Sequence, residues 1–235
     1  MSVGPRLECL FKMYSNGPKI VTDGLVLCLD AGNPKSYSGS GTAWTDISRN
    51  GINGTLTNGP TYSSANNGSI IFDGVDDYVI FSGTIVTSTA TFLIWIYRNG
   101  DQAQYDGVFL SRGTNVTGLN FFSSNQIGYH WNDNANTYNW ASGLIVPNLQ
   151  WSLCAVSVGA TSATAYLCQQ TGITSAVNNV SHASTTLNNI QMGRDSGFGN
   201  RFFAGNIAVA QIYNRALSRA EIIQNYNATK GRFKL

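Results

Sequence analysis

Short hydrophobic runs of five to nine residues recur along the whole chain, separated by segments rich in Gly, Asn and Ser. Such punctuation is typical of β-strands joined by turns, and it favours an antiparallel sandwich or barrel. Residues 91–97 (TFLIWIY) are hydrophobic on both faces, which places this strand in the middle of a sheet. The expected strands are residues 24–30, 69–74, 77–81, 89–97, 107–111, 119–123, 126–131, 150–158, 163–168, 187–193 and 205–213.

One helix is predicted near the C-terminus. Ser218 and Glu221 have the S-x-x-E spacing of a capping box. The residues that follow form an apolar stripe at helical spacing, made of Ile222, Ile223 and Tyr226. We therefore expect a closing helix over about residues 218–229, with Gly231 placed to end it.

The composition excludes several classes of protein. Only 11% of the residues are charged, 43% are hydrophobic, and the chain has two Glu and five Lys. This leaves little material for surface helices, so a helical bundle or a coiled coil is excluded. A net charge of +2 is too low, and the hydrophobic fraction too high, for a disordered chain. The composition indicates a β-rich globular protein and gives no function.

Basic residues concentrate at the two ends. Residues 1–20 carry a net charge of +2 and residues 211–235 carry +4, whereas the body between them carries −4. The ends either bind an acidic partner or are simply solvated. Five basic residues over the last 25 positions make a weak electrostatic footprint, so solvated ends are favoured and no nucleic-acid partner is expected.

Neither a membrane segment nor an export signal is expected. The longest uninterrupted apolar run, residues 92–97, is far shorter than the roughly 20 residues that span a bilayer. Near the start, Arg6, Glu8 and Lys12 interrupt the apolar stretch, so the core of a signal peptide is missing.

The four cysteines show neither a CxxC pair nor zinc-ligand spacing: Cys9, Cys28, Cys154 and Cys168. Only Cys154 and Cys168 are placed to meet, because they flank a hairpin centred near Thr161 and would lie opposite each other on neighbouring strands. They form either a disulfide or two small buried thiols. The missing export signal favours the thiols.

No catalytic signature is present, and we expect a protein that is not an enzyme. The sequence has no G-x-S-x-G elbow, phosphate-binding loop, H-E-x-x-H motif or complete EF-hand loop. The only Glu residues, Glu8 and Glu221, lie near the ends, so a glycosidase pair would need two Asp. His130, in a predicted strand, is interpreted as a packing or hydrogen-bonding residue rather than a base.

Three blocks resemble the laminin G-like, pentraxin-like members of the concanavalin A-like jelly-roll superfamily: residues 24–60, 69–81 and 192–227. The last is the most specific, because it joins a strand, a turn and a capped helix in one fixed order. The resemblance spans about residues 22–230. It implies an all-β jelly-roll sandwich of two antiparallel sheets with one short C-terminal helix.

The resemblance also implies a possible calcium site. The positions that match the ligands of the pentraxin-like pattern are Asp76, Asp77 and Asp195, and carboxylates suit Ca²⁺. The loop GRDSG around Asp195 departs from the pattern, since it offers one acid where the family has two or three. In the alternative interpretation, Asp73, Asp76 and Asp77 only form a tight hairpin whose side chains cap backbone N–H groups.

A second candidate surface is the stretch of residues 129–140, YHWNDNANTYNW. Aromatic faces pack on the C–H face of a sugar and amides bond its hydroxyls, so the composition suits a glycan. The alternative is a loop whose Trp residues are buried in the sandwich edge. The candidate glycan-binding residues are Trp131, Asn132, Asp133, Tyr138 and Trp140.

The opening pattern GPKIVTDGLVLCLDAGN resembles laminin G-like structural proteins of tailed phages, particularly those of cyanobacteria. This implies a non-catalytic virion surface protein, a capsid decoration or fibre component assembled in the host cytoplasm, with a polysaccharide as ligand. The alternative is a calcium-dependent lectin or adhesion domain of a cellular protein. We expect a homo-oligomer in which residues 1–20 form an arm that docks on other virion proteins and residues 21–235 form the domain.

Overall fold

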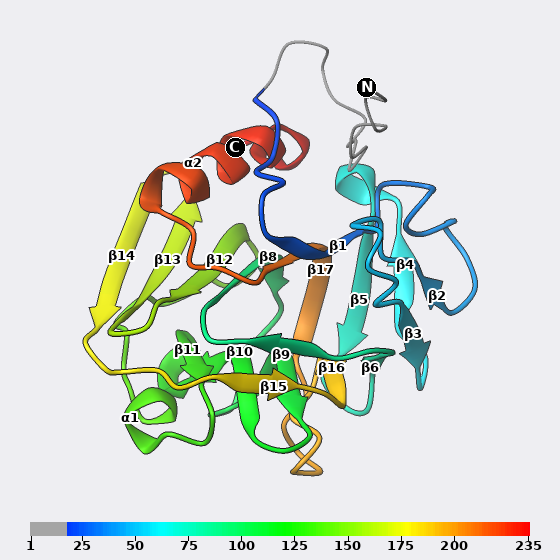
Figure 1. Cartoon of the computed structure of the whole chain (residues 1–235). Helices are drawn as coiled ribbons and strands as arrows, with labels where there is room; N and C mark the ends of the chain where they lie inside the picture. The colour runs from blue at the N-terminus through cyan, green and yellow to red at the C-terminus, as the bar shows by residue number, and fades with distance from the viewer. Residues whose placement is uncertain (1–17) are drawn as a thin grey trace, which may run out of the picture.

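The computed structural model describes residues 18–235. Two β-sheets lie face to face with the main hydrophobic core between them (Figure 1). All strand pairs in the two sheets are antiparallel. The predicted all-β sandwich of two antiparallel sheets is confirmed.

The larger sheet has eight strands, ordered β14-β13-β12-β8-β17-β5-β4, with β1 paired to β17. Strand β17 borders β8 on one side, and on the other side it pairs with β5 near its start and β1 near its end. The strands are β1 (Leu25–Asp30), β4 (Thr61–Ser63), β5 (Ser69–Asp73), β8 (Ala90–Arg98), β12 (Trp151–Val158), β13 (Ala163–Gln169), β14 (Gly172–Asn178) and β17 (Ala204–Tyr213).

The second sheet has seven strands, ordered β11-β10-β9-β16-β6-β3-β2. They are β2 (Ala43–Trp44), β3 (Gly54–Thr57), β6 (Tyr78–Phe81), β9 (Gly107–Arg112), β10 (Val116–Phe122), β11 (Gln126–His130) and β16 (Ile190–Met192). A separate pair is formed by β7 (Ile85–Thr87) and β15 (Thr185–Leu187). The short polar strands among these, such as β3, gave too weak a pattern to be predicted.

Strand β8 lies in the middle of the larger sheet, between β12 and β17, as its two-sided hydrophobicity predicted. Phe92, Ile94 and Ile96 belong to the core between the sheets, whereas Leu93 and Trp95 belong to a second core on the other face. Burial of each large side chain contributes about 1.5–3 kcal/mol. Both faces of this strand therefore stabilise the fold.

The predicted helix is α2 (Arg219–Thr229), and its capping box is complete. The Ser218 hydroxyl accepts from the Glu221 N–H, and the Glu221 carboxylate accepts from the Ser218 N–H. Gly231 does not end the helix, contrary to expectation, because the chain continues into a 3-10 turn, η3 (Lys230–Phe233), whose Phe233 is buried. No helix within residues 18–235 is long and apolar enough to cross a membrane.

Three short helical segments were not predicted: α1 (Ala135–Tyr138), η1 (Ala65–Asn67) and η2 (Ser123–Asn125). Each is three or four residues long, which is too short to show a helical period. Of these, α1 lies within the stretch of residues 129–140 that was predicted to bind a glycan.

The second core lies between the larger sheet and the C-terminal helix (Figure 1). The Trp95 indole N–H donates to the Thr229 hydroxyl at 2.8 Å, and its ring centroid lies 4.2 Å from that of Phe233. Ile20 is also buried here, and the N–H of Val21 donates to the Asn225 side chain. The predicted arm over residues 1–20 therefore extends too far, since Ile20 belongs to the domain; residues 1–17 lie outside the described residues.

Cys154 and Cys168 are free and buried, as favoured from the sequence. Their expected placement opposite each other is wrong, because Cys154 pairs with Leu167 and Cys168 pairs with Leu153. This offset of one residue puts their side chains on opposite faces of the sheet. Cys28 is also buried.

Candidate functional site

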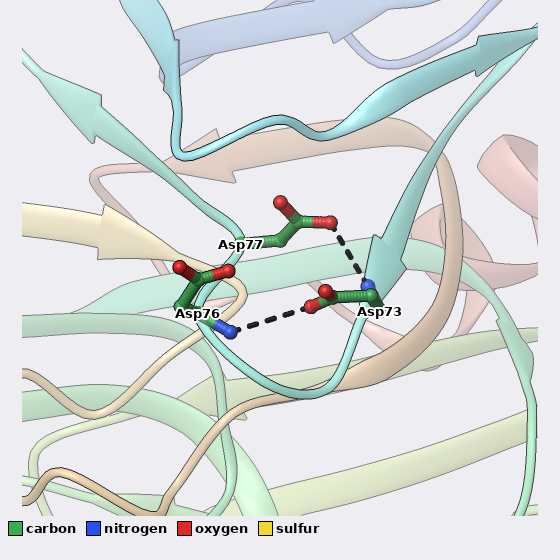
Figure 2. A group of neighbouring side chains, drawn as sticks. All are labelled: Asp73, Asp76 and Asp77. Carbon is green, nitrogen blue, oxygen red and sulfur yellow. Dashed lines mark hydrogen bonds between the residues drawn. The ribbon is translucent and has the colours of Figure 1, made fainter.

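Three aspartates meet in the turn between β5 and β6 (Figure 2). Asp73 ends β5, and Asp76 and Asp77 directly precede β6. Gly74 makes the turn possible because its φ is +78°, and a Cβ there would lie 2.7 Å from that of Ala204. Ligand oxygens from the three carboxylates all lie within 4.8 Å of one another.

Two of these carboxylates also hold the turn together. Asp73 Oδ1 accepts from the N–H groups of Val75 and Asp76, and Asp77 Oδ2 accepts from the Asp73 N–H at 3.0 Å. The Val75 N–H bond chiefly holds the pKa of Asp73 below its usual value. Burial, reinforced by the charges of Asp73 and Asp76, raises the pKa of Asp77.

The chemistry of this group fits a hard cation. No lysine or arginine within residues 18–235 forms an ion pair with the three aspartates. Three clustered carboxylates repel one another, and a divalent cation would relieve that repulsion. Turn formation and cation binding are compatible, because Asp73 and Asp77 each use only one oxygen for the turn.

Asp195 is not part of this group, so the predicted set of Asp76, Asp77 and Asp195 is wrong in its third member. Asp195 is fully buried and paired with Arg112 and Arg201, and it also accepts from the Gly197 N–H. Burial raises the pKa of Asp195, but the bonds from the two arginines outweigh it and hold the pKa below its usual value. The third member of the group is Asp73, because the turn at Gly74 brings its carboxylate close to those of Asp76 and Asp77.

The predicted glycan-binding residues are not brought together. Trp131 is 1% exposed and its indole N–H donates to the Ala183 carbonyl, so its ring cannot meet a sugar. Asp133 accepts from the Val116 N–H, and the Asn132 N–H donates to the Thr117 hydroxyl, so both residues fix the loop after β11.

Tyr138 packs on a neighbouring ring rather than lining the depression described below. Its ring stacks on that of buried His130, with centroids 5.3 Å apart. His130 is therefore a packing residue, as expected from the sequence.

Trp140 is the one predicted aromatic residue that lines an open depression, of about 350 Å³. Its ring packs edge-on against Tyr129, at 5.8 Å, and against the main core. The other lining residues come from α1, its C-terminal cap and the segment around the end of β14: Ala135, Asn136, Asn139, Asn178 and Val180.

Hydrogen bonds fix the asparagines around this depression. The Asn178 side chain donates to the Asn136 carbonyl at 2.9 Å and to the Tyr129 hydroxyl at 3.0 Å. Asn139 accepts from the Tyr105 hydroxyl. Asn136 and Asn139 lay within the stretch predicted to bind a glycan, but Asn178 was missed, because no local signal links it to α1.

The family model for the concanavalin A-like lectin/glucanases superfamily matches residues 73–223, which is more than half of the chain. Among curated proteins, none matches the sequence.

Several solved structures share the fold. Domain 4 of AbnA, an extracellular GH43 arabinanase from Geobacillus stearothermophilus in complex with arabinotriose, has a TM-score of 0.61 at 14% identity, covering 91% of this chain and all of that domain. A Trypanosoma rangeli sialidase in complex with the inhibitor DANA has a TM-score of 0.63 at 14% identity, covering 92% of this chain and 36% of the sialidase. The binding domain of Paraclostridial Mosquitocidal Protein 1 has a TM-score of 0.54 at 16% identity, covering 86% of this chain and 51% of that one. At these identities the likeness shows the fold alone.

Proposed function

Because the chain belongs to the concanavalin A-like lectin/glucanases superfamily, we propose that it is a carbohydrate-binding protein that holds a glycan in the depression around Trp140. The observation that carries this proposal is the partly exposed indole of Trp140 beside three asparagines. An aromatic face packs on the C–H face of a sugar, and amide groups donate to and accept from its hydroxyls. The arabinanase domain solved with arabinotriose is consistent with this ligand class.

Binding without catalysis is the form of the proposal that the lining residues favour. The depression is lined by Asn, Ala, Val and Trp, and none of these side chains titrates. Cleavage of a glycosidic bond normally requires a general acid and a second carboxylate beside the bond. The aspartate cluster lies in a different turn, between β5 and β6.

Calcium is the cation that we propose for Asp73, Asp76 and Asp77. Ca²⁺ takes six to eight oxygen ligands, so these three carboxylates would leave room for water or a further ligand. Such a site would neutralise the turn between β5 and β6. It also supports the alternative function, a calcium-dependent lectin or adhesion domain.

We place the protein on a phage particle, as a capsid decoration or fibre component present in many copies. The resemblance of its opening sequence to structural proteins of tailed phages supports this context. A shallow site binds weakly, and multivalent display can raise avidity by about 10² to 10⁴. Mass spectrometry of purified particles tests the assignment, and absence of the protein from such particles would contradict it.

Glycan arrays probed with the monomer and with a streptavidin-linked multimer test the binding function. We expect the multimer to bind, and Trp140→Ala to remove most of the signal. Tyr62→Ala is the matched control, because Tyr62 is also a partly buried aromatic residue packed on the main core. Asn139→Ala, a change in an exposed lining residue, provides a second variant if Trp140→Ala unfolds. Failure of both protein forms to bind any glycan would refute the proposal.

A further inference from the structure

Three arginines lie over aromatic rings on the outer face of the seven-stranded sheet, away from the main core. Val79 of β6 is buried in that core, so its neighbour Tyr78 points to the opposite side. The guanidinium carbon of Arg194 lies 4.4 Å from the Tyr78 ring centroid, and that of Arg201 lies 4.8 Å from the Tyr105 centroid. The arginine–aromatic layer is made of Arg112, Arg194, Arg201, Tyr78, Tyr105 and Phe198.

Phe198 is the most exposed ring of this layer. It is 45% exposed and lies in the loop between β16 and β17. The guanidinium carbons of Arg201 and Arg112 lie 3.5 Å and 5.1 Å from its ring centroid. The loop therefore presents a partly exposed aromatic ring beside two cations.

The layer carries excess positive charge. Asp195 accepts from both Arg112 and Arg201, and Asp106 interacts electrostatically with Arg201, so two carboxylates offset two of the three arginine charges at neutral pH. Arg194 forms no ion pair within residues 18–235; its contacts are the rings of Tyr78 and Phe202. Its guanidinium is held in place and lacks an anion.

The same side of the sheet also carries buried polar atoms without partners. Six of the eight such side-chain atoms within residues 18–235 lie there: Asp106 Oδ1, Asn120 Oδ1, both His130 ring nitrogens, Gln191 Oε1 and Arg194 Nε. Native proteins leave few buried polar groups unpaired, because each costs about 1–3 kcal/mol. Because these atoms are buried, water held beneath the layer would satisfy them.

We propose that the arginine–aromatic layer binds the acidic groups of a polysaccharide, so that the glycan contains uronic acids or sulfate. This inference rests on the proposed glycan-binding function and names the class of its ligand. A guanidinium pairs with a carboxylate or sulfate through two parallel N–H bonds, while the neighbouring rings pack on sugar C–H faces.

The layer is continuous with the depression around Trp140. The Tyr105 hydroxyl, in the layer, donates to the Asn139 side chain, which lines the depression, at 3.1 Å. A chain-like ligand can therefore contact both surfaces at once. A polysaccharide is favoured over a nucleic acid, because the net charge of +2 and one unpaired arginine are too little for the phosphate contacts on which nucleic-acid affinity depends.

Titration of the full chain with alginate, a polyuronate, and with neutral galactomannan tests the inference. We expect alginate to bind more tightly, and Arg194→Gln to weaken alginate about tenfold, the loss typical of one charge-assisted contact, without changing galactomannan binding. The alginate affinity of Arg194→Lys should lie between those of wild type and Arg194→Gln, because lysine keeps the charge but lacks the planar guanidinium. Arg219→Gln is the matched control, since Arg219 is exposed on α2, over the other sheet.

The outcomes separate the two proposals. Equal binding of both polysaccharides, unchanged by Arg194→Gln, would overturn the acidic ligand and leave the glycan-binding function standing. Failure of both polysaccharides and of the glycan array would overturn the function itself. Single-stranded DNA that binds as tightly as alginate, with the same sensitivity to Arg194→Gln, would overturn the assignment to polysaccharide.

Discussion

The side chain of Asn178 donates a hydrogen bond of 2.9 Å to the backbone carbonyl of Asn136. Asn178 ends β14, the edge strand of the larger sheet, whereas Asn136 lies in α1, which follows β11 at the edge of the smaller one. This contact ties the two sheets together beside the depression. The shape of the candidate glycan site therefore depends on a bond between distant parts of the chain.

Replacement of Asn178 by Ala should weaken both stability and glycan binding. The change removes the donor to Asn136 and leaves the buried Tyr129 hydroxyl with one partner fewer, which costs about 1–3 kcal/mol. Urea unfolding measures the stability, and titration with the best array ligand measures the affinity. Thr174→Ala, in the same edge strand, is the control; an unaltered affinity in Asn178→Ala would contradict the assigned role.

Calcium should stabilise the wild-type protein and have no effect on Asp73→Asn/Asp76→Asn. For a site built on these three carboxylates we expect a dissociation constant of about 10⁻⁴ to 10⁻³ M, in the extracellular range. At ten times the dissociation constant, binding adds about 1.4 kcal/mol to the free energy of unfolding. Thermal melting with and without 10 mM calcium, at roughly ten times the weaker constant, is the measurement. An unchanged wild-type melting temperature would leave the aspartates with their turn role only.

Loss of the capping hydroxyl in Ser218→Ala should destabilise the protein by about 1 kcal/mol. The Ser218 side chain accepts from the Glu221 N–H, and α2 covers the Trp95 side of the larger sheet. Ser218→Asp, which keeps an acceptor at the cap, should restore most of the stability. Equal unfolding free energies for wild type and Ser218→Ala would show that helix packing alone fixes α2.

The sandwich and the closing helix were predictable from the sequence because their signals are local. The two-sided hydrophobicity of β8 and the spacing of Ser218 and Glu221 depend on near neighbours alone. Strand β14 lacks such a local signal. It is an exposed edge strand with little hydrophobic pattern, and it was therefore not predicted.

The candidate sites were only half predictable because they depend on distant contacts. Asp195 was predicted to bind a metal, but in the fold it pairs with Arg112, which lies 83 residues away in the sequence. Trp131 was predicted to pack on a sugar, but its indole N–H donates to the Ala183 carbonyl and the ring is buried in the fold. The residue types in the sequence indicated which ligands could be bound, whereas the burial of each side chain determined whether a ligand can reach it.

Two buried titratable groups should give opposite pH dependences of stability. Burial lowers the pKa of His130 to about 4, from an ordinary value of 6.5, with Arg112 and Arg201 adding to the effect and Asp195 opposing it. Burial raises the pKa of Asp106 to about 6, from 3.8; the Ala103 N–H and Arg201 oppose this shift, and Asp195 adds to it.

The sign of each effect follows from which state binds the proton first. As the pH falls from 6.5 to 4, unfolded His130 is protonated before the folded form, so stability is lost, by about 3 kcal/mol. Folded Asp106 is protonated before the unfolded form, so between pH 6 and 4 stability is gained, by about 2 kcal/mol. In the wild type the two effects largely cancel.

Single variants should reveal each effect separately. Asp106→Asn removes the gain, so its stability relative to wild type should fall by about 2 kcal/mol between pH 6 and 4. His130→Phe keeps a ring against Tyr138 and removes the loss, so its relative stability should rise by about 3 kcal/mol between pH 6.5 and 4. Urea unfolding at pH 7, 5.5 and 4 measures both, and the double variant should run parallel to the wild type. Single variants that also run parallel to the wild type would show that neither group titrates in this range.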